Sequence, residues 1–209
     1  MYSRLIEKLS KRLTLALPSA LAHDPLRAIP IGDNVPDFRH SAPPKPGSVL
    51  VLLYAHNGRV KFPFIRRQEY IGAHSGQISL PGGKAEPGED AVDTALREAQ
   101  EEVGINPTRI NVIGRLSQFN VVVSNVLVTP VVASVLETPV FTPDPYEVHS
   151  IFHCDLLALI RDDAIHIEEI LAGGRYRMRA PHFKVEEHVV WGATAMMLNE
   201  LRVVVKEIL

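Results

Sequence analysis

The chain has 209 residues, of which 46% are hydrophobic, and a formal net charge of −2. This length and apolar content fit a single domain with one sizeable core. The nearly balanced charge gives no electrostatic basis for binding nucleic acid. The single cysteine, Cys154, excludes an intramolecular disulfide framework, so we expect a core thiol in a protein of the cytoplasm.

The first 46 residues are predicted to form a helix and a linker ahead of a catalytic domain at 47–209. Over residues 1–22, apolar side chains recur at helical spacing among lysines and arginines, which predicts an amphipathic helix. Charges are too frequent there for a signal peptide, and no segment approaches the ~20 apolar residues of a membrane span. We expect this helix to pack on the domain or on a partner subunit, with no membrane partner. Residues 25–46 are rich in proline and predict an ordered linker.

The rest of the chain alternates strand patterns with helical ones. Apolar, β-branched runs at 48–54 and 60–66 flank His56-Asn57-Gly58, which predicts a β-hairpin. Further strands are predicted at 76–80, 110–118, 126–136, 149–154, 168–170, 175–179 and 182–190, and a final helix at 194–209. Strands mixed with two or three helices predict an α/β sandwich with a mixed β-sheet. We expect Trp191 to pack in its core.

A helix is predicted near residues 90–103, directly behind a glycine-rich turn at 80–83. Glu98, Glu101 and Glu102 stand at i, i+3 and i+4, so they share one face of this helix, opposite an apolar stripe. Like charges at this spacing repel each other, and hard carboxylate ligands suit Mg²⁺ or Mn²⁺. The pattern therefore predicts a metal site for phosphoryl chemistry. Taken alone, the same string also fits a solvated, glutamate-rich surface helix.

A longer pattern overturns that plainer explanation. It reads glycine, five residues, glutamate, seven residues, then arginine, glutamate, aliphatic, any, two glutamates, any, glycine, aliphatic. The residues that fill it are Gly83, Glu89, Arg97, Glu98, Ala99, Glu101, Glu102, Gly104 and Ile105. The pattern resembles the signature of the Nudix hydrolases. The resemblance implies a Nudix-type α/β/α sandwich and metal-dependent hydrolysis of a pyrophosphate bond in a nucleoside diphosphate derivative.

The resemblance also implies roles for particular residues. Glu98, Glu101 and Glu102 would bind Mg²⁺ or Mn²⁺ together with the carbonyl group of Gly83. Arg97 would be catalytic by orienting these ligands through an ion pair with Glu89.

The segment ahead of the signature narrows the substrate. It keeps Arg67, Gly76 and Pro81-Gly82-Gly83 of the motif that coenzyme A pyrophosphatases carry, and it resembles that subfamily. It departs from the motif at Ile65, Gln68, Gly72 and Leu80, and the missing arginine at position 72 removes a potential phosphate contact. The substrate-binding residues expected from this segment are Arg67, His74, Gln77 and Gly82.

Segments 147–152 and 190–195 resemble the same subfamily. Glu147 is a candidate general base or extra metal ligand, since Nudix enzymes often recruit a carboxylate from a loop outside the signature. An acid in solvent is an equally good interpretation of Glu147.

The expected reaction is cleavage of coenzyme A or acyl-CoA into 3′,5′-ADP and a 4′-phosphopantetheine compound. The alternatives are hydrolysis of ADP-ribose, another nucleotide sugar or a dinucleotide, and a non-catalytic Nudix module that senses a nucleotide. The complete set of metal glutamates favours an enzyme. The expected partner is a small nucleotide substrate, and the subfamily resemblance implies a homodimer.

Overall fold

The computed structural model describes residues 2–69 and 76–209. Its helices and 3-10 turns are α1 (Tyr2–Leu13), α2 (Ala20–His23), η1 (Asp24–Leu26), α3 (Ala91–Val103), η2 (Pro107–Arg109), α4 (Leu156–Leu159) and α5 (Gly192–Lys206). Its strands are β1 (Ile29–Pro30), β2 (Lys45–His56), β3 (Arg59–Arg67), β4 (Ile78–Ser79), β5 (Gly82–Lys84), β6 (Asn111–Arg115), β7 (Phe119–Val121), β8 (Val126–Ser134), β9 (Val148–Asp155), β10 (Ile165–Ala172), β11 (Tyr176–Val185) and β12 (His188–Trp191).

The larger sheet is mixed. Its strands lie in the order β4-β3-β2-β8-β6, with β5 paired to β2, β7 to β8 and β9 to β3. Strands β2 and β8 run parallel, whereas their other pairings are antiparallel. A smaller antiparallel sheet places β11 between β1 and β10, with β12 also paired to β11.

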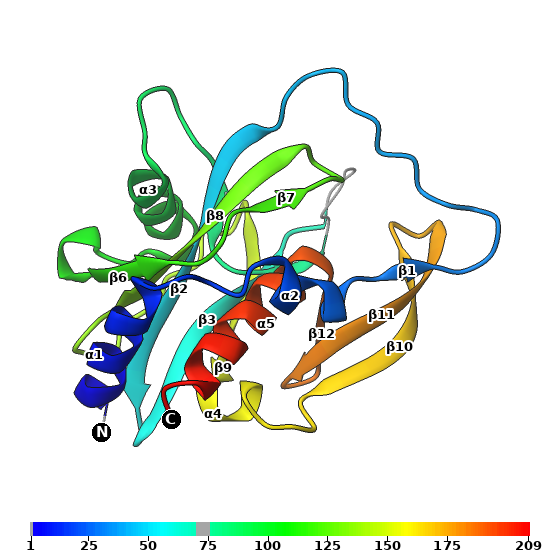
Figure 1. Cartoon of the computed structure of the whole chain (residues 1–209). Helices are drawn as coiled ribbons and strands as arrows, with labels where there is room; N and C mark the ends of the chain where they lie inside the picture. Colours follow the sequence, from blue (N-terminus) through cyan, green and yellow to red (C-terminus); the bar gives the residue numbers. More distant parts are fainter. Residues whose placement is uncertain (1, 70–75) are drawn as a thin grey trace.

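Helices cover both faces of the mixed sheet (Figure 1). Because side chains alternate along a strand, β2 sends Leu50, Leu52 and Tyr54 into the core layer beneath α3. Its intervening residues, Val51 and Leu53, enter the core shared with α1 and α5. The expected α/β/α sandwich with a mixed sheet is confirmed.

The predicted hairpin is present. Asn57 and Gly58 connect β2 to β3 with φ values of 50° and 74°, as a two-residue turn of this kind requires. The helix predicted over 1–22 is shorter, since α1 ends at Leu13 and only α2 follows before residue 24. The short strands β1, β5 and β7 were not predicted. They are two or three residues long and depend on neighbouring strands.

Helix α1 packs on the catalytic fold, one of the two placements expected for it. Its residues Leu9 and Leu13 are buried in the core. The hydroxyl of Tyr2 donates to the carbonyls of Leu53 (2.7 Å) and Val135 (3.0 Å), at the ends of β2 and β8. The division at residues 46 and 47 stays a prediction. Over residues 2–69 and 76–209, no helix combines the length and apolar character that crossing a bilayer requires.

Candidate active site

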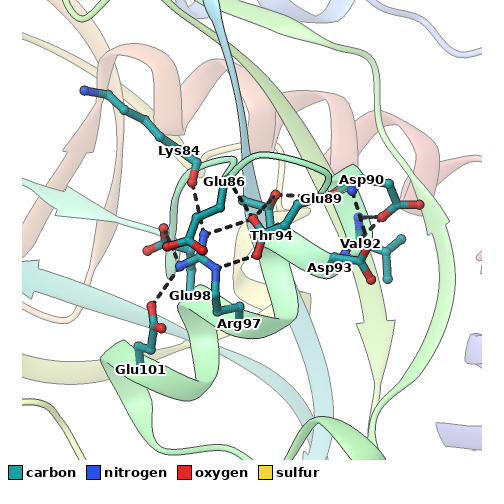
Figure 2. Close-up of polar contacts among 10 residues, drawn as sticks. All are labelled: Lys84, Glu86, Glu89, Asp90, Val92, Asp93, Thr94, Arg97, Glu98 and Glu101. Atoms are coloured by element: carbon teal, nitrogen blue, oxygen red, sulfur yellow. Dashed lines mark hydrogen bonds and ion pairs between the residues drawn. The ribbon is translucent and has the colours of Figure 1, made fainter.

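Helix α3 is fixed at both ends by its own sequence. The side chain of Asp90 accepts from the amides of Val92 (2.6 Å) and Asp93 (3.0 Å), and Asp93 accepts from the amide of Asp90 (3.2 Å; Figure 2). This capping box satisfies amides that the first turn leaves unpaired. Gly104 ends the helix in the left-handed region, with φ of 69°. The helix predicted near 90–103 is thus confirmed.

Arg97 gathers carboxylates on one side of this helix (Figure 2). Its Nε donates to Glu89 (2.6 Å), and its Nη1 donates to both Glu98 (3.1 Å) and Glu101 (2.8 Å). Its Nη2 donates to the carbonyl of Lys84 at 3.1 Å, which ties α3 to the end of β5. Hydrogen bonds from Arg97 hold the pKa of Glu89 down at about 2. The Arg97–Glu89 ion pair expected from the sequence is present.

Glu102 points inward, against β5. Its carboxylate is 1% exposed, and Oε2 accepts from the amide of Gly82 at 2.7 Å. Its Oε1 lies 3.3 Å from Nη2 of Arg67 but has no hydrogen bond among the described residues. Burial raises the pKa of Glu102 to about 7, against the attraction of Arg67. A buried, incompletely paired carboxylate is costly for a fold unless a cation can bind there.

Glu98 lies directly under Gly83. A Cβ atom added at Gly83 would fall 2.3 Å from Oε1 of Glu98, so a larger residue at position 83 would force that carboxylate to shift. Burial raises the pKa of Glu98, and the charges of Glu101 and Glu147 act in the same direction. Glu147 is exposed on the loop before β9, and its charge also acts on Glu102. Glu147 is therefore near enough to act electrostatically on Glu98 and Glu102, although it comes from a distant part of the sequence.

The three glutamates do not meet at one point, contrary to the convergence expected from helical spacing. Glu98 and Glu101 share Arg97, Glu101 is 58% exposed, and Glu102 turns toward Arg67. The two arginines draw the carboxylates to separate places. Across the described part of the chain, no three histidine, cysteine or acidic side chains stand close enough to hold a metal ion.

The donor set nevertheless fits a hard divalent cation. It offers carboxylate oxygens with raised pKa values, one of them a buried oxygen without a hydrogen bond. Mg²⁺ and Mn²⁺ prefer such ligands. Glu98 and Glu102 lie against β5 and are the best placed of the three glutamates to bind such a cation, whereas Glu101 is more exposed.

A cavity of about 650 Å³ opens beside β5, and its described lining includes Gly82 and Gly83, the two residues that lie against the glutamates of α3. Arg67, Gln77 and Gly82 line it, as their predicted contact with substrate requires. Both backbone polar groups of Gly82 already have hydrogen-bond partners, since its amide donates to Glu102 and its carbonyl accepts from Arg67 at 2.9 Å. His74, the fourth predicted substrate residue, lies outside the described residues.

Much of the cavity lining is apolar. Hydrophobic lining side chains come from β7, β8, the turn between them, the end of β12 and the start of α5: Phe119, Val121, Val122, Val123, Val126, Val128, Trp191, Ala193 and Met197. Trp191 is only partly buried and lines the cavity, so its expected place in the core was wrong. Among the described lining residues the charged side chains are all cations: Arg27, Arg67 and Lys84. Sequence reasoning missed Arg27, which sits in a segment without a motif.

Comparisons with known proteins agree with this geometry. The NUDIX domain family matches residues 44–172. "Nudix hydrolase 22, chloroplastic" of Arabidopsis thaliana is 32% identical over 170 residues, covering 78% of this chain and 56% of that protein. "Uncharacterized Nudix hydrolase NudL" of Yersinia enterocolitica is 31% identical over 170 residues, covering 76% of this chain and 85% of that protein. The chain belongs to the Nudix hydrolase family, which acts on pyrophosphate bonds and generally needs a divalent metal.

Solved structures support the fold. The Nudix hydrolase RenU of M. Smegmatis aligns with a TM-score of 0.52 and 15% identity, covering 80% of this chain and 89% of that one. A MutT/nudix family protein of Enterococcus faecalis aligns with a TM-score of 0.50 and 16% identity, covering 96% and 73%. The expected Nudix fold is therefore confirmed, and the family match confirms the expected membership of the Nudix hydrolases. The chain spans little more than half, 56%, of the plant relative's length.

Proposed function

We propose that this protein hydrolyses the pyrophosphate bond of a nucleoside diphosphate derivative, with coenzyme A or acyl-CoA as its substrate. The products would be 3′,5′-ADP and a 4′-phosphopantetheine compound. One observation carries the proposal: Gly82 and Gly83 of β5 line a cavity whose described charged lining is entirely cationic, and the same two glycines lie against the carboxylates of Glu102 and Glu98. The segment from Arg67 to Gly83, which resembles that of coenzyme A pyrophosphatases, supports the choice of substrate.

In this proposal Glu98, Glu101, Glu102 and the carbonyl of Gly83 would hold Mg²⁺ or Mn²⁺. When bound, the metal would supply charge stabilisation at the phosphate oxygens and a water of lowered pKa. Arg97 would orient two of these carboxylates, because its Nη1 donates to Glu98 at 3.1 Å and to Glu101 at 2.8 Å. Its role is therefore positioning.

Glu147 is the residue that we assign to accept the proton of the attacking water. The water oxygen forms the new bond to phosphorus, the bond from phosphorus to the leaving phosphate oxygen breaks, and the proton passes to a carboxylate. The exposure of Glu147 and its electrostatic effect on Glu98 and Glu102 support this assignment.

The cations and polar groups along β5 would bind the phosphates. Arg67 and Lys84 line the same end of the cavity, where they would offset the negative charge of a pyrophosphate. Gln77 and, outside the described residues, His74 belong to the same proposed binding set. The cytoplasmic location and the homodimer expected from the sequence remain proposals as well.

A panel of substrates with product identification tests the function. Coenzyme A, ADP-ribose, NADH and dinucleoside polyphosphates would be supplied with Mg²⁺ or Mn²⁺. We expect coenzyme A to be cleaved fastest, into 3′,5′-ADP and 4′-phosphopantetheine. Faster cleavage of ADP-ribose would overturn the choice of substrate, and no cleavage of any compound would favour the nucleotide-sensing module.

A substitution tests the site assignment. Glu101→Gln is expected to abolish turnover with little loss of stability, because Glu101 is exposed and repels its neighbours. Glu137→Gln is a matched control, since Glu137 is an exposed acid that is likewise paired with an arginine, Arg109. Retention of magnesium-dependent hydrolysis in Glu101→Gln would refute the assignment.

A further inference from the structure

Part of the cavity is built by segments outside the matched NUDIX residues 44–172. Arg27 comes from the segment that joins η1 to β1, and Trp191, Gly192, Ala193, Thr194 and Met197 come from the end of β12 and the start of α5. In Figure 1, α2 lies against α5, on the side of the mixed sheet away from α3. The two flanking segments therefore contribute a part of the cavity lining that comes from neither β5 nor α3.

The position of Arg27 is fixed by buried contacts of the preceding residues. The carbonyl of Ala22 accepts from Nδ2 of Asn199 at 2.7 Å, and Leu26 is fully buried in the core. The amide of Arg27 donates to the carbonyl of Asp24 at 3.0 Å, which closes the 3-10 turn. Because the backbone at Arg27 is already fixed, binding a ligand through its side chain would cost side-chain entropy alone.

The guanidinium of Arg27 retains donors for a ligand. Its Nε (3.3 Å) and Nη2 (2.8 Å) both donate to a single oxygen, Oδ1 of Asp24, in a pair that is 60% and 59% exposed. A guanidinium carries five N–H donors in a planar fork, and phosphate is a preferred acceptor for that geometry. The contact with Asp24 therefore orients the side chain without using all of its donors.

The cations around the cavity fall into two groups. Arg67 and Lys84 stand at β5, beside the α3 glutamates, whereas Arg27 belongs to a segment that packs on α5 and β11. The apolar side chains of β7, β8 and Trp191 also line the cavity. A pyrophosphate held at β5 would use the first group alone and would leave Arg27 without a role.

We propose that Arg27 binds a second anionic group of the substrate, a phosphate monoester remote from the pyrophosphate that is cleaved. This inference rests on the proposed function, because it assumes that the cavity beside β5 takes the substrate. It makes Arg27 a specificity-determining residue that the NUDIX match does not include.

Two ligands that differ by one phosphate test the proposal directly. Binding of 3′,5′-ADP and of 5′-AMP would be measured by titration calorimetry with a chelator present, so that no metal is involved. Arg27→Gln is expected to weaken binding of 3′,5′-ADP about tenfold, as for loss of a charged hydrogen bond, and to leave 5′-AMP within about twofold. Arg27→Lys should restore part of the difference, since it keeps the charge.

Arg39→Gln provides the matched control. Arg39 also pairs with a nearby aspartate, Asp37, at 2.6 Å, but it does not line the cavity. Its substitution should change the binding of neither ligand. Equal weakening of both ligands by Arg27→Gln, or no change in either, would overturn the proposal.

Kinetics separate this inference from the proposed function. With coenzyme A and dephospho-coenzyme A as substrates, Arg27→Gln should raise KM for the first about tenfold and for the second by less than about twofold, with kcat unchanged. If coenzyme A is the best substrate but Arg27→Gln raises KM equally for coenzyme A and dephospho-coenzyme A, the inference fails and the proposed function stands. If ADP-ribose proves to be the better substrate, the proposed function fails, and a remaining difference between 3′,5′-ADP and 5′-AMP through Arg27 would point to another substrate that carries a phosphate monoester.

Discussion

Two glutamates of this protein are buried to nearly the same degree but differ in how many hydrogen bonds they accept. Glu200 on α5 is fully buried, and four groups donate to it: the amide of Ser19 (2.8 Å), the amide (2.9 Å) and hydroxyl (2.6 Å) of Ser117, and the ring of His23 (3.3 Å). Glu102 on α3 is 1% exposed and accepts one hydrogen bond, from Gly82.

The pKa shifts of the two carboxyls have opposite directions. Burial alone would raise the pKa of Glu200, but its hydrogen-bond donors lower it below the ordinary value. Burial dominates at Glu102 and raises its pKa to about 7. The fold thus provides a full set of hydrogen bonds for Glu200, a buried acid that links segments of the chain. It leaves Glu102 of α3 incompletely paired, as expected if Glu102 binds the metal in the proposed function.

The largest effect is expected from Glu102→Gln. The amide keeps an acceptor for Gly82 but loses the negative charge, so hydrolysis should fall on the order of 100-fold or more. The free energy of unfolding should stay the same or rise, because a buried charge is removed. Kinetics and thermal unfolding without metal measure both quantities. A strongly destabilised variant would show that Glu102 is a structural acid like Glu200.

Glu200→Gln should give the converse result. Replacing a carboxylate oxygen by an NH₂ group places a donor against the donors of Ser19 and Ser117, so the free energy of unfolding should fall by about 2–4 kcal/mol. The kcat of the folded fraction should change by less than about twofold. Denaturant unfolding and kinetics well below the melting temperature provide the readouts. Loss of kcat in a folded variant would contradict a purely structural role.

The pH dependence of stability sharpens the contrast. Because the folded pKa of Glu200 lies below its reference value of 4.5, its contribution is present above that pH and is lost as the pH falls through the folded pKa. The difference in unfolding free energy between wild type and Glu200→Gln should therefore be constant from pH 6 to 8 and shrink below about pH 4.5. A difference that grows on acidification would show that the carboxyl is not paired as described.

The smallest effect is expected from Gly83→Ala. The added Cβ would meet the carboxylate of Glu98 at 2.3 Å, so that side chain must move and hydrolysis should fall roughly tenfold to 100-fold. Combination with Glu98→Gln tests the cause by a double-mutant cycle. Gly83→Ala should add little to Glu98→Gln if it acts through Glu98, and full additivity would contradict that explanation.

The sequence predicted the elements that local spacing and caps define. Helix α3 between Asp90 and Gly104 and the hairpin at Asn57-Gly58 follow from short-range patterns. The Arg97–Glu89 ion pair was implied by the resemblance to the Nudix signature. Helical spacing correctly placed three glutamates on one side of α3. It could not predict that Arg97 and Arg67 would separate them, because arginine pairing depends on side-chain rotamers and on a strand from another part of the chain.

The cavity wall could not be predicted either. Phe119 belongs to a strand of three residues that forms only by pairing with β8, and Arg27 sits in a segment that is fixed by α5, far along the sequence. Trp191 was misplaced for a related reason: an aromatic residue at the edge of a core and one that lines a cavity look alike in sequence.

The contacts of Glu200 fasten the first thirty residues of the chain to its last helix. Ser19 and His23 from the beginning, Ser117 from the middle and Glu200 near the end all meet at one carboxylate. Trimming the protein to the matched span 44–172 would remove both that acid and Arg27 of the cavity lining. The outer segments thus complete the fold and the cavity, so shortened versions should lose thermal resistance and, under the proposed role of Arg27, substrate discrimination as well.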